Sequence, residues 1–216
     1  MIESFFLMVI AAGLTAGAIR AFDRARVRDV ASPKQTELLQ RLWDYATQAL
    51  KKQRWDAAER ALLKILKHDH KNVSAYNQLG MVYVRTKQLD NAAVCFEIAS
   101  SLAPSVSSLY NLGLVQYQQG DFDAAARALE RVIDLEPTIK RQLVFAKVLQ
   151  KQGAHKRVVA VLESVAEEEP SRRNLQYLAE AYDNIGQEEK AQETRREITR
   201  LDSQTPQQFQ PERMRT

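Results

Sequence analysis

Cysteine is nearly absent from the sequence: Cys95 is the single one among 216 residues. One thiol excludes an intramolecular disulfide framework and a four-thiolate zinc or iron–sulfur site built by one chain. The sequence also lacks the patterns G-x-x-x-x-G-K-[ST], G-x-S-x-G and H-E-x-x-H, which are typical of phosphate-binding loops, serine hydrolases and zinc peptidases. We therefore expect no catalytic residues, no metal site and no cofactor.

A strong excess of one charge is also lacking. Lysine and arginine number 31 and aspartate and glutamate 27, which leaves a net charge of 31 − 27 = +4 on a chain that is 27% charged. This balance does not favour nucleic-acid binding, for which basic residues gather on one face. Hydrophobic residues make up 45% of the chain, which is enough for a buried core and too many for a disordered protein.

One long uncharged run lies near the start of the chain, at residues 5–19. As a helix this run reaches only about 22 Å, whereas the hydrocarbon core of a bilayer is about 30 Å thick. With its flanks the run covers residues 2–22, and that length reaches the thickness of the core. We therefore expect residues 1–22 to form a transmembrane anchor, followed by a basic juxtamembrane linker at 23–34.

The basic residues after this run predict the topology. Four arginines follow it: Arg20, Arg24, Arg26 and Arg28. By the positive-inside rule these arginines stay in the cytoplasm, so a single-pass protein of the plasma (inner) membrane is predicted, with its main body cytoplasmic. Gly13 and Gly17 form a G-x-x-x-G pattern that lets two membrane helices approach, which predicts a homodimer through these helices. The alternative is that small residues are common in such helices.

The rest of the chain repeats itself. Prolines and glycines recur at intervals of 33 residues: Pro104, Pro137 and Pro170; Gly120, Gly153 and Gly186; Gly80 and Gly113. The glycines of the first triplet follow apolar-periodic segments, and there a left-handed helix C-terminus costs glycine little. Gly80 and Gly113 fall inside helical patterns, where glycine costs about 1 kcal/mol against alanine, so we expect close helix–helix approach there. Ser105, Thr138 and Ser171 follow the prolines and are expected to cap the next helix.

Each unit is therefore predicted to be two antiparallel helices, and the clearest unit begins at Val73. Eight of its residues match the tetratricopeptide repeat (TPR) pattern W-x2-L-G-x2-Y, A, F, A, P: Tyr76, Leu79, Gly80, Tyr83, Ala92, Phe96, Ala99 and Pro104. The chain thus resembles the TPR family. The resemblance implies an α-solenoid of about five helix-turn-helix repeats over residues 35–202. Together with the hydrophobic run, this predicts an all-α fold in which a single transmembrane helix precedes the solenoid. The polar tail at 203–216 contains two prolines, and we expect it to be disordered. The expected repeats are 39–72, 73–105, 106–138, 139–171 and 172–202.

The resemblance also implies where a partner binds, because the first helix of each TPR pair lines a concave groove. The candidate groove residues lie off the core positions of these helices: Asn77, Met81, Arg85, Tyr110, Leu114, Tyr117, Lys140, Lys147 and Lys151. An apolar and aromatic middle beside a basic patch suits an extended peptide or a helix with acidic groups. The alternatives are that the lysines are ordinary solvated residues and that the two tyrosines pack within the array.

These features favour a membrane-tethered scaffold or adaptor that binds a protein or peptide partner in the groove and assists assembly of a membrane complex. One alternative is an organellar protein-import receptor, although the lysine stripe argues against the basic ligands that such a receptor binds. Another is binding of anionic lipid or nucleic acid through the basic residues. We expect no nucleic-acid partner, because the sequence shows no dedicated face on which aromatic and basic residues interleave.

Overall fold

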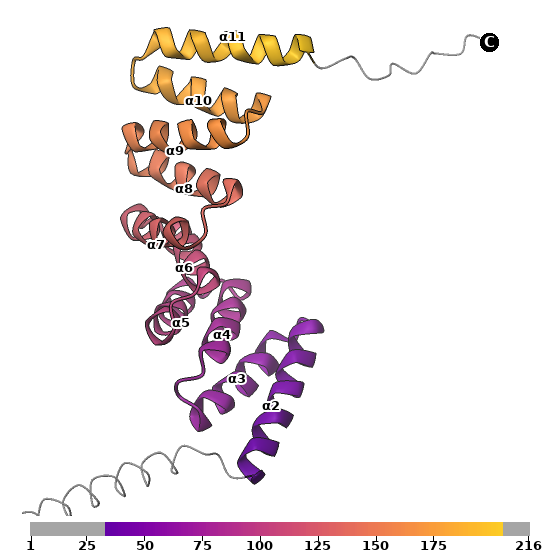
Figure 1. Cartoon of the computed structure of the whole chain (residues 1–216). Coiled ribbons are helices and arrows are strands. Elements are labelled where there is room, and N and C mark those ends of the chain that lie inside the picture. Colours follow the sequence, from indigo (N-terminus) through magenta and orange to yellow (C-terminus); the bar gives the residue numbers. More distant parts are fainter. Residues whose placement is uncertain (1–32, 205–216) are drawn as a thin grey trace, which may run out of the picture. The chain divides into compact units, whose positions relative to one another are not determined.

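The computed structural model describes residues 33–204, and over this range the chain forms α-helices joined by short turns (Figure 1). The predicted all-α solenoid of helix pairs is confirmed there. The chain is divided into two compact units, of which the first ends at His70 and the second starts at Lys71. The helices of the described residues are α2 (Pro33–Lys51), α3 (Trp55–His68), α4 (Val73–Arg85), α5 (Leu89–Leu102), α6 (Val106–Gln119), α7 (Phe122–Leu135), α8 (Ile139–Gln152), α9 (His155–Glu168), α10 (Arg172–Asn184) and α11 (Glu188–Gln204).

The first unit contains the helix pair α2 and α3. Small and branched side chains fill the contact between the two helices, and Ala46, Leu62 and Ile65 are fully buried. Leu38 and Tyr45 of α2 remain 42% and 48% exposed. Helix α2 is therefore amphipathic, and it buries one stripe of its surface against α3.

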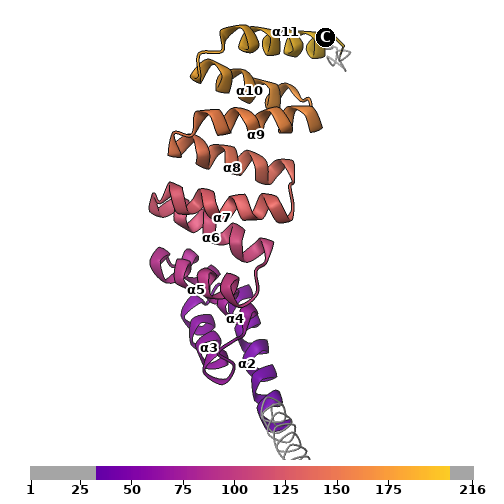
Figure 2. The same cartoon turned by 60° about the vertical axis from the view of Figure 1, so that its left-hand side comes forward.

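The second unit stacks four antiparallel pairs, α4 with α5 through α10 with α11 (Figure 2). The first helix of each later pair also packs against the second helix of the pair before it. Each helix from α5 to α9 contributes a large side chain that is at most 1% exposed: Phe96, Leu109, Leu129, Leu149 and Val165. Because one pair cannot bury its apolar face alone, this stacking creates the core.

Left-handed backbone closes the first helix of every pair described. Gly120, Gly153 and Gly186 take φ values of 83°, 79° and 73°, so the predicted glycine C-termini are confirmed. The two earlier pairs hold Gln53 and Lys87 at this turn, with φ values of 55° and 61°. A residue that has a Cβ atom is strained in this left-handed region, so the backbone of Gln53 and Lys87 costs free energy in the folded state.

Gly80 and Gly113 mark close helix–helix contacts, as their place inside helical patterns predicted. A Cβ atom added to Gly80 would lie 2.7 Å from Cε1 of Phe96, and one added to Gly113 would lie 2.8 Å from Cγ of Leu129. Both distances are below van der Waals contact. The missing side chains therefore let the two helices of a pair approach each other.

The predicted N-caps are confirmed at two of three positions. The hydroxyl oxygen of Ser105 accepts a hydrogen bond from the backbone N–H of Ser108 at 3.1 Å, and Ser171 accepts one from Asn174 at 3.2 Å. Thr138 occupies the same place before α8, but its side chain makes no capping hydrogen bond. The turns before α6 and α10 are therefore held by their own side chains.

Consecutive pairs are also joined by a recurring hydrogen bond. The amide of Gln119 donates to the carboxylate of Asp90 at 2.7 Å, and Gln152 donates to Asp123 at 2.7 Å. At the next joint, between α9 and α10, the hydroxyl of Tyr182 donates instead to Glu163 at 2.6 Å. Burial, together with this bond, raises the pKa of the Tyr182 hydroxyl above its ordinary range.

The predicted localisation is wrong. Among the helices of residues 33–204, none combines the length and the apolar character that crossing a membrane requires. The longest, α2, has 19 residues, but Lys34, Glu37, Arg41, Asp44 and Lys51 interrupt it with charge. The expected anchor at 1–22, with Gly13 and Gly17, lies outside the described residues.

Candidate functional site

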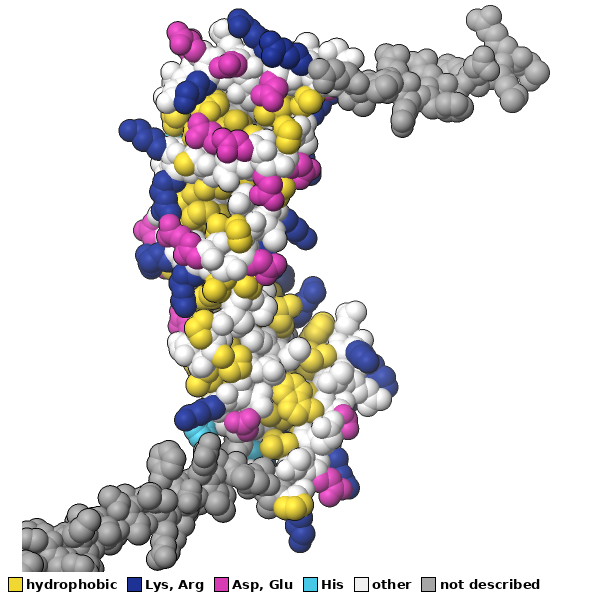
Figure 3. Space-filling view, viewed as in Figure 1, with side chains coloured by type: hydrophobic (Ala, Val, Ile, Leu, Met, Phe, Trp, Pro, Cys, Tyr) yellow, Lys and Arg dark blue, Asp and Glu magenta, His cyan; other side chains and the backbone are white. Residues whose placement is uncertain are grey.

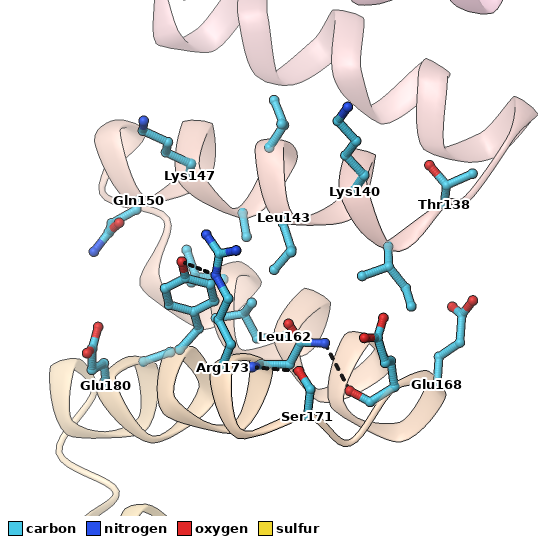
Figure 4. Close-up of a pocket in the computed structure, with 18 of the residues that line it drawn as sticks. Thr138, Lys140, Leu143, Lys147, Gln150, Leu162, Glu168, Ser171, Arg173 and Glu180 are labelled. Carbon is cyan, nitrogen blue, oxygen red and sulfur yellow. Dashed lines mark hydrogen bonds between the residues drawn. The ribbon is translucent and has the colours of Figure 1, made fainter. Parts of the chain in front are cut away.

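A large open pocket lies between α8 and α10, the first helices of two consecutive pairs (Figure 4). Its volume is about 1100 Å³. Leu143 and Val144 of α8 and Leu162 of α9 line it with apolar surface, and Tyr177 adds an aromatic ring from α10. A concave, largely apolar site with a few polar groups at its edge is the usual form of a binding site in proteins.

Charged side chains surround this apolar floor. Lys140 and Lys147 extend from α8, whereas Glu180 extends from α10 on the opposite side (Figure 4). Glu168 and Glu169 line the pocket from the end of α9 and the turn that follows it. All five side chains are exposed, and among the described residues no ion pair joins a lysine of this set to a glutamate of it.

The α10 wall is held in place by local hydrogen bonds. Arg173 donates from Nε to the Tyr177 hydroxyl at 3.0 Å, and its guanidinium carbon lies 5.7 Å from the centre of the Tyr177 ring. Asn174 is 4% exposed, and its side-chain amide donates to the backbone carbonyl of Glu169 at 2.9 Å. The positions of the Tyr177 ring and of the α9–α10 turn are thereby fixed before any ligand binds.

A second, smaller pocket of about 590 Å³ lies between α6 and α8. Tyr110 and Asn111 line it from α6, and Thr138 and Lys140 line both this pocket and the larger one. Arg141 closes one edge through an ion pair of 2.7 Å with Glu136. The two pockets are therefore neighbours along the first helices of three pairs, with Thr138 and Lys140 lining both.

The structure brings some of the predicted groove residues together. Lys140 and Lys147 line the larger pocket, and Tyr110 lines the smaller one. Tyr117 is half-buried: its ring lies 5.6 Å from that of Phe122, and Nζ of Lys147 lies 6.0 Å from its centre. Both tyrosines also pack against the buried core, so each contributes to the array as well as to the groove side.

The other candidate residues line neither pocket. Lys151 is exposed beyond the end of the larger pocket, and Leu114 is half-buried on α6. Asn77, Met81 and Arg85 lie on α4: Met81 and Arg85 are exposed, and Asn77 is half-buried with an Oδ1 atom that accepts no hydrogen bond within the described chain.

Several residues that line the pocket were not predicted from the sequence. Leu143 on the floor and Arg173 and Tyr177 on the opposite wall were not singled out, although Arg173 and Tyr177 are four apart and so share a helix face. Glu168 and Glu169 follow the end of a helix, where a glutamate run is ordinary. The spacing contained a signal for α10, but only packing brings these residues opposite α8.

The single thiol is not an activated nucleophile. Cys95 is 5% exposed, and burial raises its pKa from 9.0 to about 11. A thiol with this pKa is almost entirely protonated at neutral pH, and the thiolate is the nucleophilic form. Within residues 33–204, no three histidine, cysteine, aspartate or glutamate side chains are grouped as a metal site.

Among solved structures, the fold is similar to that of MamA. A crystal structure of MamA protein aligns with a TM-score of 0.68 and 22% identity over 82% of this chain and 100% of that one. MamA AMB-1 aligns with a TM-score of 0.65 and 21% identity, over 77% and 93% of the two chains. MamA 41-end from Desulfovibrio magneticus RS-1 aligns with a TM-score of 0.64 and 14% identity, over 78% and 97%. At these identities the likeness establishes the fold alone.

Comparison of sequences identifies the repeat. No curated protein matches the chain. The family model described as tetratricopeptide repeat matches residues 46–105, and the model described as anaphase-promoting complex, cyclosome, subunit 3 matches residues 85–165. Such repeats form scaffolds for protein–protein interaction and are generally not catalytic. The two models together span residues 46–165, and with the repeated helix pairs they show that the chain contains tetratricopeptide-type repeats.

Proposed function

We propose that this scaffold binds a peptide or helix of a partner protein in the groove formed by α6, α8 and α10, with the pocket between α8 and α10 as the main contact. The observation that carries the proposal is the open apolar floor at Leu143, Val144 and Tyr177, which adjacent helices leave uncovered. An apolar side chain of a partner gains free energy when it enters such a floor, at roughly 25 cal/mol for each Å² removed from water.

Two further features support the proposal. The α10 wall is pre-organised by the bonds of Arg173 and Asn174, so little ordering is needed when a ligand arrives. Lys140 and Lys147 stand exposed beside the floor and would receive acidic groups of the partner. The groove also extends toward α6, and a pocket of that form suits a polymer chain better than a compact small molecule.

The test is selection of short peptides from a display library on the full chain, followed by affinity measurements on variants. Leu143→Glu places a charge on the half-buried floor, and it should weaken the selected peptides by at least about tenfold, since a buried apolar contact of one side chain is worth about 1.5–3 kcal/mol. Val94→Glu is the matched control, because Val94 is 53% exposed on α5 and lines neither pocket.

Circular dichroism of both variants checks that the helices remain folded. Peptides that bind the Leu143→Glu variant as tightly as the original chain would refute the groove as the site of binding.

A further inference from the structure

The two sides of the α8–α10 pocket carry charge of opposite sign. Lys140 and Lys147 stand on the α8 side, and Glu168, Glu169 and Glu180 stand on the side of α10 and the turn before it (Figure 4). These side chains are exposed and, in the described part of the chain, are not paired across the pocket. Figure 3 shows the same mixture over the stacked helices, with apolar side chains lying between charges of both signs.

Arg173 places one cation on the α10 side of the pocket. Its Nε–H bond to the Tyr177 hydroxyl and its place 5.7 Å from the ring centre draw the guanidinium over the pocket. In Figure 4 this group rises from α10 toward α8. The α8 side thus carries two lysines, and the other side carries three glutamates and one arginine, a net charge of 1 − 3 = −2; the pocket as a whole has no net charge.

This arrangement discriminates between classes of ligand. A uniformly acidic segment would pair with the α8 side but would be repelled by the three glutamates, and a uniformly basic segment would meet the reverse. Like-charge contacts across an interface are costly, so they select against such partners. A segment that separates its charges onto two edges avoids both penalties.

The secondary structure of the occupant follows from the same geometry. An apolar stripe with one acidic and one basic edge requires side chains that point in three directions. A helix provides them, because positions three and four apart form a stripe with flanking positions on each side. In an extended strand, successive side chains point to two opposite faces, so one face cannot present a stripe and two edges in this way.

We propose that the occupant of the α8–α10 pocket is an amphipathic helix of a partner protein, with acidic side chains on the edge that faces α8 and basic side chains on the edge that faces α10. This inference rests on the proposed function and names the chemistry of its ligand. The apolar stripe of the helix lies on Leu143, Val144 and Tyr177.

The probes are two synthetic helical peptides of identical composition, each with a leucine stripe. In the first, glutamates occupy one edge and lysines the other; in the second, glutamates and lysines alternate on both edges. The full chain should bind the first peptide about tenfold more tightly, because several exposed ion pairs form together in that complex and not in the other. Fluorescence anisotropy at low ionic strength measures both affinities.

Charge reversal on each wall makes the test specific. Lys140→Glu with Lys147→Glu gives two acidic walls and should weaken the first peptide about tenfold, and Glu168→Lys with Glu180→Lys should do the same with two basic walls. Combining all four substitutions restores opposite walls, and the peptide should bind again in the reverse direction. Lys156→Glu and Glu167→Lys are the matched controls, since both residues are exposed on α9 and line no part of this pocket.

Equal affinity for the two peptides, or no recovery in the fourfold variant, would overturn the inference. If binding is lost with Leu143→Glu but is indifferent to the arrangement of charge, the proposed function stands and only the two-edged helix is wrong. If peptides bind equally well with and without Leu143, both the proposed function and the two-edged helix are refuted. Both are also refuted if no peptide binds, whether designed or selected.

Discussion

The turn between α4 and α5 contains a strained residue whose replacement is expected to stabilise the protein. Lys87 takes a φ of 61° at the position where later pairs have Gly120, Gly153 and Gly186. A left-handed backbone costs a residue with a Cβ about 1–2 kcal/mol. Lys87→Gly removes this strain but adds conformational entropy to the unfolded chain, which costs about 0.4–1 kcal/mol. The net gain is therefore about 0.5–1 kcal/mol.

The exposed Lys87 side chain contributes little that would be lost with it, and the turn retains its backbone hydrogen bond from Gln88 to Tyr83 at 2.8 Å. Urea unfolding followed by circular dichroism measures the change as a shift of the midpoint at constant slope. Arg127→Gly is the matched control: Arg127 is exposed in the interior of α7, where glycine is expected to cost about 1 kcal/mol.

Opposite signs for these two substitutions would confirm that the turn needs a left-handed residue. If Lys87→Gly lowers the midpoint as much as Arg127→Gly does, the reasoning is refuted, because the strain at Lys87 would then be smaller than the entropy cost of glycine.

Three further predictions concern caps, packing and the thiol. Ser171→Ala should lower the free energy of unfolding by about 1 kcal/mol because it removes a capping bond, whereas Thr138→Ala should change it little because Thr138 makes no such bond; urea titrations of both variants compare them. Gly80→Ala should destabilise the chain by about 1–3 kcal/mol in the same assay, since its Cβ would lie 2.7 Å from the Phe96 ring, and an unchanged midpoint would contradict the close approach. Cys95 should resist iodoacetamide at pH 8 in the folded chain and react when the chain unfolds. Its pKa of about 11 in the folded chain lies above the 9.0 of the free thiol, so its contribution to stability is complete below pH 9 and is lost as pH rises toward 11. Unfolding experiments at alkaline pH measure this loss.

The sequence by itself was sufficient for the architecture of the repeat, because the signals are local. Gly120, Gly153 and Gly186 mark the ends of first helices, where the backbone must be left-handed, and Ser105 and Ser171 mark helix starts through their own capping bonds. The turn at Lys87 has the same geometry without glycine, so composition did not reveal it. Conformational requirements of this kind act within a few residues and therefore leave a readable pattern.

The groove was only half predictable. Lys140 and Lys147 could be assigned to one face of a first helix from their spacing, because side chains seven apart lie above one another. The glutamates that face them belong to other elements, at the end of α9 and on α10, and no periodicity within α8 points to them. The hydrophobic run at 5–19, by contrast, favoured a localisation that the described helices do not support.

The sequence alone thus determined the helix pairs, their turns and the glycines at which the helices approach, since these depend on backbone conformation and on side chains close in the chain. Only the tertiary structure decided that an apolar floor stays open between α8 and α10, and that a basic wall faces an acidic one there. The physical reason is that a pocket exists between elements: its shape and charge come from side chains about 30 residues apart, which only the stacking of successive pairs brings together.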